Sequence, residues 1–235
     1  MPTRSRQRDQ QRAALGRLDV FSAFSSGELD DLAELARIRR YARGRTLVTQ
    51  GDVTDAAFGI VSGRLRVSLS RADGSEATLT LLGPGELFGE LGLFQDASRS
   101  AHVTALEDAC VLAIGKSEFL AALRHSPAAS LALCQLLASR IRQLVQHFEE
   151  VTAMPVEQRL ARKLVFLAAR WGEPAAGGTG ISLRLSQREL AELVDTSRQT
   201  ANKCLAKWRK AGVLASSARK LVIRDLSALR RHAGT

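Results

Sequence analysis

Residues 88–101 read FGELGLFQDASRSA, and this stretch contains the groups needed to hold a cyclic phosphate. Gly89 allows the backbone an approach that a Cβ atom would block. The Glu90 carboxylate can accept a hydrogen bond from a sugar hydroxyl, and the Arg99 guanidinium can donate two parallel hydrogen bonds to phosphate oxygens. Ser100 adds a hydroxyl donor. The stretch therefore predicts a phosphate site, and a β-hairpin with a solvated arginine is the alternative.

A short helical turn from Glu90 to Phe94 would direct its free N–H groups at the same anion. The order Gly-Glu-Leu-Gly-Leu-Phe followed by Arg-Ser-Ala resembles the phosphate-binding cassette of the cyclic-AMP receptor protein family, which includes the fumarate–nitrate regulators. The resemblance covers residues 18–226, and we call residues 88–101 the cassette. It implies that the ligand is bound by Gly89, Glu90, Leu91, Arg99, Ser100 and Ala101.

The fold class that this resemblance implies is α+β. An N-terminal β-roll, or jelly roll, would bind the cyclic nucleotide, a long helix would form a dimer, and a C-terminal winged helix-turn-helix would bind DNA. The corresponding divisions are a disordered basic arm over residues 1–17, the β-roll over 18–127, the dimerisation helix over 128–153 and the DNA-binding domain over 154–235. RNA polymerase is a further implied partner.

The positive charge is confined to the C-terminal part of the chain. The net charge is +10, and residues 151–235 hold 16 Lys or Arg and 6 Asp or Glu, whereas residues 1–150 hold 18 of each. A basic domain beside a neutral one is typical of a nucleic-acid-binding module with a separate control domain. No stretch approaches the ~18 apolar residues of a membrane span, and the polar start MPTRSRQRDQQR lacks the apolar segment of a secretory signal.

The three cysteines, Cys110, Cys134 and Cys204, lie far apart and lack C-x-x-C spacing. This usage predicts a reducing cytoplasm and no structural zinc. Each cysteine has apolar neighbours, so we expect three buried thiols.

The period of the hydrophobic pattern changes along the N-terminal half. Residues 18–40 follow a helical period, with Ser25 or Ser26 as a cap and an apolar stripe of Leu29, Leu32, Leu35 and Ala36. From residue 44 to 114 the period is two, which predicts short strands at 46–48, 58–61 and 65–69 and a hairpin turn at 72–74. Many short strands with glycine turns indicate a sandwich or jelly roll.

A long helix is predicted from Ala128 to Thr152, after a helical region that starts at Ser117 and is interrupted at Pro127. An apolar seam with coiled-coil spacing runs along it, formed by Cys134, Ala138, Ile141, Val145, Phe148 and Thr152. A second stripe, Leu133, Leu137 and Leu144, can pack on the roll. Two stripes imply two partners, so we predict a parallel homodimer; a helix wedged within its own monomer is the alternative.

Residues 186–214 read SQRELAELVDTSRQTANKCLAKWRKAGVL, which is typical of a helix-turn-helix. Ser186 and Glu189 form a capping box, and Leu190 and Leu193 face a core. Within the motif we predict a turn over 195–197 and a second helix from 197 or 198, with the apolar face Ala201, Leu205 and Trp208. Before the motif we predict a hinge at 154–155, a helix over 156–171, a loop over 172–180 and a strand over 181–185. A wing hairpin is predicted over 213–224.

The start of the second helix carries the residues predicted to contact DNA, namely Ser197, Arg198, Gln199, Asn202 and Lys203. Arginine can bond guanine O6 and N7, and glutamine can bond adenine N6 and N7. The family pattern is Arg, Glu, then Arg four residues after the Glu. Here Gln199 and Lys203 replace the last two, so we expect a two-fold-symmetric operator shifted in sequence from the family's TGTGA half-sites.

The identity of the nucleotide stays open. In the family a Thr-Ser pair on the long helix contacts adenine, and those positions fall at Leu144 and Val145, which cannot hydrogen-bond. Gln143, Gln146 or His147 are the possible substitutes. Cyclic AMP is the first choice of effector, and cyclic GMP and cyclic di-GMP are alternatives.

Other chemistries fit the sequence less well. An iron–sulfur cluster needs clustered cysteines, which are lacking, and a haem iron would have to use His102, His125 or His147 beside an intact cassette. A cupin-like metalloenzyme needs clustered histidines and carboxylates near the roll, where only His102 lies, so no enzyme activity is expected. A DNA-binding dimer with a vestigial pocket remains an alternative.

Overall fold

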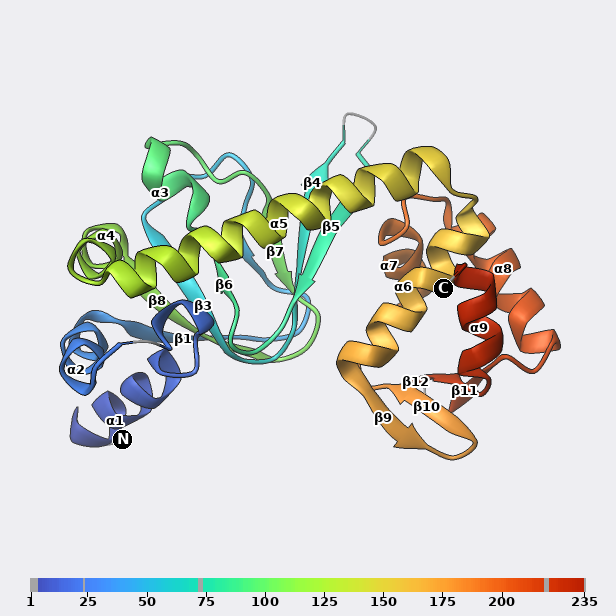
Figure 1. The fold of residues 1–235 in the computed structure, drawn as a ribbon, viewed down its shortest axis with the longest axis horizontal. Coiled ribbons are helices and arrows are strands. Elements are labelled where there is room, and N and C mark those ends of the chain that lie inside the picture. The colour runs from blue at the N-terminus through green and yellow to red at the C-terminus, as the bar shows by residue number, and fades with distance from the viewer. Residues whose placement is uncertain (1–3, 23, 72–73, 218–219, 235) are drawn as a thin grey trace. The chain divides into compact units, whose positions relative to one another are not determined.

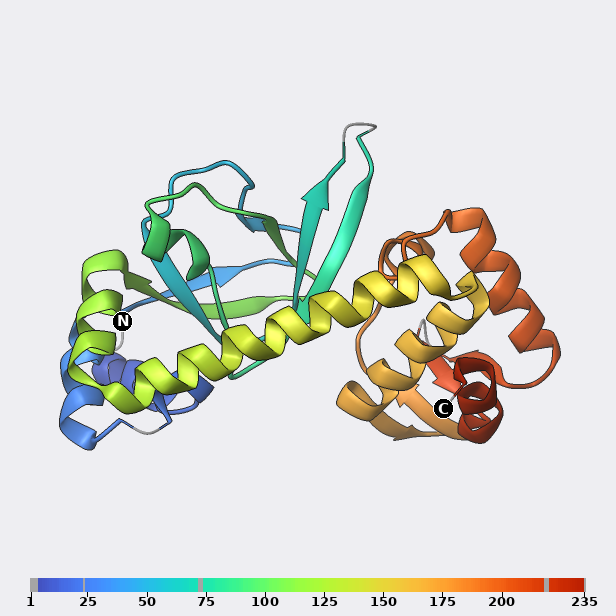
Figure 2. The same cartoon turned by 45° about the horizontal axis from the view of Figure 1, so that its top comes forward.

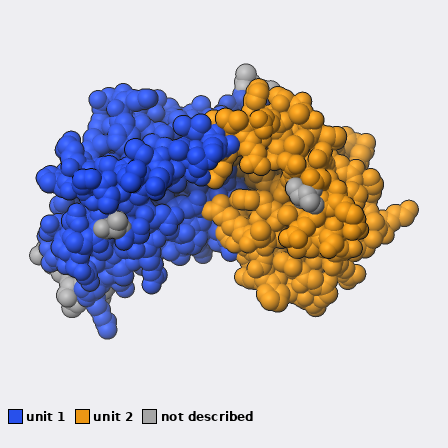
Figure 3. All heavy atoms as spheres, in the orientation of Figure 1, with its two compact units in different colours: residues 1–72, 80–142 blue, residues 73–79, 143–235 orange. Residues whose placement is uncertain are grey.

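A computed structural model describes residues 4–22, 24–71, 74–217 and 220–234 (Figure 1). The chain divides into two compact units, Met1–Ala72 with Thr80–Arg142 and Asp73–Leu79 with Gln143–Thr235 (Figure 3). Helix α5, Pro127–Ala153, continues unbroken across the boundary (Figure 2), so the long helix is confirmed. Within the described ranges, no helix has the length and apolar character needed to cross a membrane.

The roll consists, in the described residues, of two four-stranded sheets with the strand orders β1-β8-β3-β6 and β2-β7-β4-β5. The strands are β1 Arg37–Tyr41, β2 Thr46–Val48, β3 Ala56–Ser62, β4 Leu65–Ser70, β5 Glu76–Leu82, β6 Leu87–Phe88, β7 His102–Ala105 and β8 Ala109–Gly115. Strand β8 pairs antiparallel with both β1 and β3, and β4 pairs antiparallel with β7. The predicted strands at 46–48, 58–61 and 65–69 are therefore confirmed, whereas two residues of the 72–74 turn lie outside the described residues.

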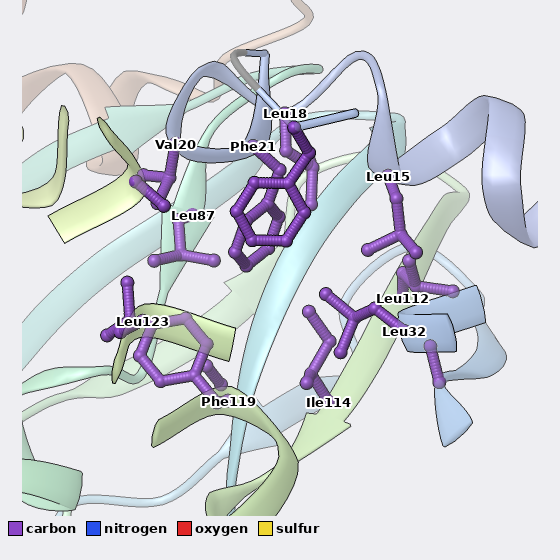
Figure 4. Close-up of a cluster of buried hydrophobic side chains, with 14 of the residues drawn as sticks. Leu15, Leu18, Val20, Phe21, Leu32, Leu87, Leu112, Ile114, Phe119 and Leu123 are labelled. Atoms are coloured by element: carbon purple, nitrogen blue, oxygen red, sulfur yellow. The ribbon is translucent and has the colours of Figure 1, made fainter. Parts of the chain in front are cut away.

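Two apolar cores support this roll. One includes Phe58 and Phe88, whose rings stack with centroids 5.1 Å apart. The other joins the first sheet to the helices and contains Leu112, Ile114 and Phe119 (Figure 4). Residues 56–60 of β3 are all buried because the sheet is covered on both faces, which explains why this strand is a continuous apolar run.

The N-terminal segment differs from two predictions. Residues 4–15 form helix α1, Arg4–Leu15, instead of a disordered arm, because Leu15 is fully buried and the side chain of Gln11 donates to the Ala36 carbonyl. The helical pattern over 18–40 is divided into a 3-10 turn, Asp19–Phe21, helix α2, Ser26–Leu35, and strand β1. Ser25 caps α2 in a capping box with Glu28. Leu35, expected in the apolar stripe, is 53% exposed.

The second unit contains α6, Val156–Trp171, α7, Gln187–Glu192, α8, Arg198–Lys210, and α9, Leu226–Ala233, with a sheet of order β11-β12-β10-β9 in its described part. The wing is formed by β11, Leu214–Ser217, and β12, Lys220–Ile223. The predicted loop at 172–180 is wrong, because β9, Gly172–Ala175, and β10, Gly178–Ile181, form an antiparallel hairpin there. The strand predicted at 181–185 accordingly ends at Ile181.

Candidate functional site

The cassette leaves β6 through a glycine and enters a short helix. Gly89 has φ +78°, and a Cβ atom built on it would lie 2.7 Å from Nη1 of Arg99. Glu90 then precedes helix α3, Leu91–Gln95, so the predicted helical turn forms. The close approach of the Arg99 guanidinium to this backbone therefore requires glycine at position 89.

The Arg99 side chain is enclosed by protein groups, in contrast to the alternative of a solvated arginine. It is 6% exposed, and its Nη1 atom donates to the carbonyl oxygens of Ala56 and Gly89, each at 2.8 Å. Its Nη2 atom donates to Oδ1 of Asp55 at 2.9 Å, and the Asp55 side chain is 71% exposed. Burial lowers the pKa of Arg99, and the Asp55 carboxylate opposes this shift. A phosphate could reach this guanidinium by taking the place of the exposed carboxylate.

Glu90 is held by a residue that the sequence analysis missed. Its side chain is 1% exposed, and Oε1 accepts from Nη1 of Arg140 on α5 at 2.5 Å. Arg140 also donates through Nη2 to the Leu87 carbonyl. The other carboxylate oxygen, Oε2, is buried and has no hydrogen-bond partner among the described residues. A buried acceptor of this kind is costly unless a donor reaches it.

The remaining predicted ligand residues differ in how exposed their side chains are. Ser100 is exposed, Ala101 is buried, and Leu91 on α3 is half exposed. The Arg99 backbone is fixed against the loop before β3, because its N–H donates to the Asp52 carbonyl and its own carbonyl accepts from Gly51. The backbone of the cassette is thus anchored at Arg99 to a loop that is distant in the sequence.

The predicted seam of α5 forms an exposed apolar stripe on this chain. Ile141 is 64% exposed, Val145 52% and Phe148 68%, and Cys134 and Ala138 are exposed as well. The prediction that all three thiols are buried is therefore wrong for Cys134, because it lies on this stripe, while Cys110 and Cys204 are partly buried.

The second stripe of α5 packs only in part. Leu133 is buried and Leu137 is partly buried against the core below the helices, but Leu144 is 57% exposed. Leu144 belongs to the second compact unit, whereas the other two belong to the first.

The candidate purine contacts belong to the second unit, and the cassette residues belong to the first. Gln143, Leu144 and Gln146 are exposed on α5. His147 is partly buried, and burial lowers its pKa, with a further lowering by Lys163 and smaller opposing effects of Glu150 and Asp195. His147 therefore lies among charged groups of its own unit, which disfavours it as a purine contact.

The helix-turn-helix forms as the sequence predicted. The Ser186 N–H donates to Glu189 Oε2 at 2.6 Å, and the Glu189 N–H donates to Ser186 Oγ at 3.2 Å, which completes the capping box. Leu190 and Leu193 are buried, and the apolar face of α8, formed by Ala201, Leu205 and Trp208, is fully buried. The turn at 195–197 includes Asp195 in a left-handed conformation with φ +53°.

The predicted DNA contacts divide into exposed and occupied side chains. Arg198, Gln199 and Lys203 are exposed at the start of α8. Ser197 instead caps α8, because its Oγ accepts from the Thr200 N–H at 3.1 Å. Asn202 is partly buried, and its Oδ1 atom is buried without a hydrogen-bond partner among the described residues. The predicted contacts whose side chains can reach base edges are therefore Arg198, Gln199 and Lys203.

No cluster of three or more His, Cys, Asp or Glu side chains able to hold a metal ion occurs in the part of the chain that the structure describes.

Comparisons with known proteins match both parts of the chain. The cyclic nucleotide-binding domain family matches residues 38–126, and the Crp-like helix-turn-helix domain family matches residues 158–232. A cyclic AMP receptor protein of Thermus thermophilus is 31% identical over 89% of this chain and 94% of its own length. A CRP-like cAMP-activated global transcriptional regulator of Mycobacterium tuberculosis is 28% identical over 93% and 98%. The solved structure of the c-di-GMP responsive global regulator CLP of Xanthomonas campestris is 25% identical, covers 86% of this chain and 100% of its own, and has a TM-score of 0.74.

Proposed function

The chain belongs to the CRP/FNR family of transcription regulators, and from this premise we propose that it is a cytoplasmic homodimer in which a cyclic nucleotide controls operator binding. Cyclic AMP is the first choice of effector. The nucleotide occupies the cassette, the α5 seam joins the two copies, and α8 reads a palindromic operator. RNA polymerase is the further partner of the DNA-bound dimer, and the chain catalyses no reaction.

The observation that carries the nucleotide part is the pair formed by Glu90 and Arg99. Glu90 Oε2 is buried without a donor among the described residues. The guanidinium of Arg99 donates to the carbonyl of Gly89, the residue directly before Glu90, at 2.8 Å. A ribose hydroxyl would supply the missing donor to Glu90, and the cyclic phosphate would replace Asp55 at Arg99. A ribose and a phosphate in one small molecule match this pairing of acceptor and cation.

The choice among nucleotides depends on the second unit. Two relatives are named for cyclic AMP, and one solved relative is named for cyclic di-GMP. The exposed amides of Gln143 and Gln146 are the polar groups of α5 that could bond a purine, and the partly buried His147 is the weaker candidate. Cyclic GMP and cyclic di-GMP are therefore the alternatives to be measured beside cyclic AMP.

A ligand-independent regulator is the second candidate function. It is favoured by one observation: both terminal nitrogens of Arg99 already have protein acceptors, including a carboxylate. Under this alternative the contacts of the cassette only stabilise the fold, and no cyclic nucleotide binds.

The dimer and the operator reading have separate support. The exposed stripe of Ile141, Val145 and Phe148 follows coiled-coil spacing, and burying it against a second copy would remove apolar surface from water. Arg198, Gln199 and Lys203 are exposed at the start of α8, where a helix-turn-helix contacts base edges.

Isothermal titration calorimetry of cyclic AMP, cyclic GMP and cyclic di-GMP tests the proposal. We expect at least one to bind at the cassette, and Arg99→Ala to weaken that binding by about 2 kcal/mol, roughly 30-fold. Glu90→Ala should weaken it through the sugar contact, while Arg124→Ala, an exposed arginine of α4, Lys116–His125, serves as the matched control. Absence of binding by all three nucleotides would favour the ligand-independent regulator.

Coupling to DNA is tested by reciprocity. If nucleotide changes operator affinity by a factor of about 5–150, operator DNA must change nucleotide affinity by the same factor. Titrating the nucleotide with and without operator DNA measures this factor. Equal nucleotide affinities in the two titrations would mean that the cassette does not control α8.

A further inference from the structure

A single buried side chain links the end of the long helix to the turn that precedes the recognition helix. Arg159, in the first turns of α6, is 8% exposed. Its Nη1 atom donates to the carbonyls of Met154 at 2.9 Å and Val151 at 3.3 Å, at the C-terminal end of α5. Its Nε atom donates to the Val194 carbonyl at 3.0 Å and its Nη2 atom to the Asp195 carbonyl at 3.2 Å.

The chemistry of these four contacts explains why an arginine occupies the position. The last carbonyls of a helix have no partner within the helix, so the end of α5 needs donors from elsewhere. The carbonyls of Val194 and Asp195 are consecutive in the turn, where Asp195 has φ +53°. One edge of a planar guanidinium, formed by Nε and Nη2, can donate to two neighbouring carbonyls. The Nη1 atom lies on the other side and donates here to the carbonyls of Val151 and Met154. A lysine ammonium has no such fork.

The turn that Arg159 holds lies directly before the recognition helix α8. Ser197 caps α8 two residues after Asp195, and Arg198 and Gln199 follow directly. The start of α8 therefore follows directly on the backbone that Arg159 holds, and the same side chain holds the end of α5. All of these residues belong to one compact unit, so the link is contained within it.

We infer that Arg159 is the positioning residue that fixes the recognition helix relative to the end of α5, and that it carries the effect of the nucleotide to α8. The second half of this inference rests on the proposed function, because it requires that a nucleotide biases α5. A contact can carry a bias from one element to another only if it binds both of them. The four backbone contacts of Arg159 lie on both sides, two at the end of α5 and two at the turn before α8.

The test compares the parent with Arg159→Lys, Arg159→Met and the control Arg162→Met. Arg162 is the matched control for the turn, because it is a partly buried arginine of α6 that donates to the Ala233 carbonyl at 2.9 Å and pairs with Glu150 of α5 at 3.6 Å. It shares the charge and the helix of Arg159 but has none of the contacts that Arg159 makes with the carbonyls of Val194 and Asp195. Arg159→Lys keeps the charge and provides the result if Arg159→Met fails to fold.

The first readout is amide hydrogen exchange of the full chain. The N–H groups of Met154, Val194 and Thr196 are hydrogen-bonded next to the four carbonyls. We expect exchange at both the end of α5 and the turn to rise at least about tenfold in the Arg159 variants. In Arg162→Met, exchange at the turn should stay at the parent value. If neither segment or only one segment changes in the Arg159 variants, the link is refuted.

The second readout is operator affinity with and without cyclic AMP. We expect the ratio of the two affinities, roughly 5- to 150-fold in the parent, to fall below about twofold in Arg159→Lys. Nucleotide affinity without DNA should be unchanged, and Arg162→Met should keep the parent ratio. A parent ratio retained in Arg159→Lys would show a merely structural role and overturn the inference. If the parent itself ignores all three nucleotides, the proposed function fails, and the inference then requires weaker operator binding by Arg159→Lys than by Arg162→Met.

Discussion

Arg140 of α5 and Glu90 of the cassette form an ion pair at 2.5 Å, in which the carboxylate is 1% exposed. The carboxylate proposed to receive the ribose is therefore already held by the long helix. This pair connects the candidate ligand site with the helix that carries the proposed dimer seam, through two side chains and within one compact unit.

Arg140→Ala should destabilise the chain and weaken nucleotide binding. Removing the partner of a buried charge costs about 3–5 kcal/mol, and we expect the lower end because the Arg140 side chain is one-quarter exposed. Urea unfolding measures the loss. Glu90→Gln in the Arg140→Ala background should restore part of the stability because it removes the unpaired charge. The same loss in the exposed control Arg142→Ala would show that the pair is not responsible.

Asp55→Asn should strengthen nucleotide binding. Asp55 is the carboxylate partner of the buried Arg99, so its replacement should lower stability and free the guanidinium for phosphate. The loss of stability should be smaller than that for Arg140→Ala, because the Asp55 side chain is 71% exposed and asparagine keeps an acceptor oxygen. We expect a several-fold gain in affinity that shrinks with rising salt. The exposed Asp108→Asn, whose carboxylate accepts from the Arg43 N–H, is the control. Weaker binding by Asp55→Asn would mean that this carboxylate positions Arg99 for the ligand.

The sequence predicts the cassette and the helix-turn-helix well because their determinants are local. The glycine at 89, the Ser186–Glu189 capping box and the apolar face of α8 all lie within a few residues of the element they define. The partners of the charged site residues are not local. Arg140 lies 50 residues from Glu90, and Asp55 lies 44 residues from Arg99, so no spacing in the sequence indicates either pair.

The missed elements have equally physical causes. Helix α1 is rich in arginine and glutamine, and its ordering depends on burying Ala14 and Leu15 against the roll. Strand β1, RIRRY, reads as the end of a charged helix until it pairs with β8. The hairpin of β9 and β10 is rich in glycine, and its pairing with β12 stabilises strands that propensity disfavours.

Ile141→Asp should abolish the proposed homodimer. Ile141 is 64% exposed on one chain, and two symmetric copies of the substitution would place like charges in the seam. Sedimentation should show monomers at concentrations where the parent is dimeric. Gln143→Asp lies about 200° around the helix and should keep the dimer. A dimeric Ile141→Asp would show that the exposed stripe is not the interface.

Stability should fall on mild acidification because of His147. Burial is the largest cause that lowers the pKa of His147 in the folded chain. Lys163 and Arg159 lower this pKa further, and Glu150 and Asp195 oppose the shift. As pH falls below about 6.5, the unfolded chain takes up the proton first, so the free energy of unfolding decreases until the lowered folded pKa is reached. Above that window His147 has no effect. The parent should lose more stability between pH 7.5 and 5.5 than His147→Gln does, whereas the exposed-site control His125→Gln should behave as the parent.

Arg198→Ala should change which sequence is read, rather than how strongly DNA is held in general. Arg198 is exposed at the first position of α8, where a bidentate contact to guanine is worth about 1–3 kcal/mol of discrimination. In a selection from random DNA, the base preference of Arg198→Ala should therefore be weaker than that of the parent at one base pair of each half-site. Arg209→Ala and Lys210→Ala, exposed in the last turn of α8, should instead weaken all sequences alike and reduce the salt dependence, because they are placed for phosphates. Lys207 is a poorer phosphate candidate than these two, since its ammonium already binds Glu157 at 2.9 Å. The same consensus from Arg198→Ala and the parent would remove Arg198 from the set of base-reading residues and leave Gln199 and Lys203 to account for specificity.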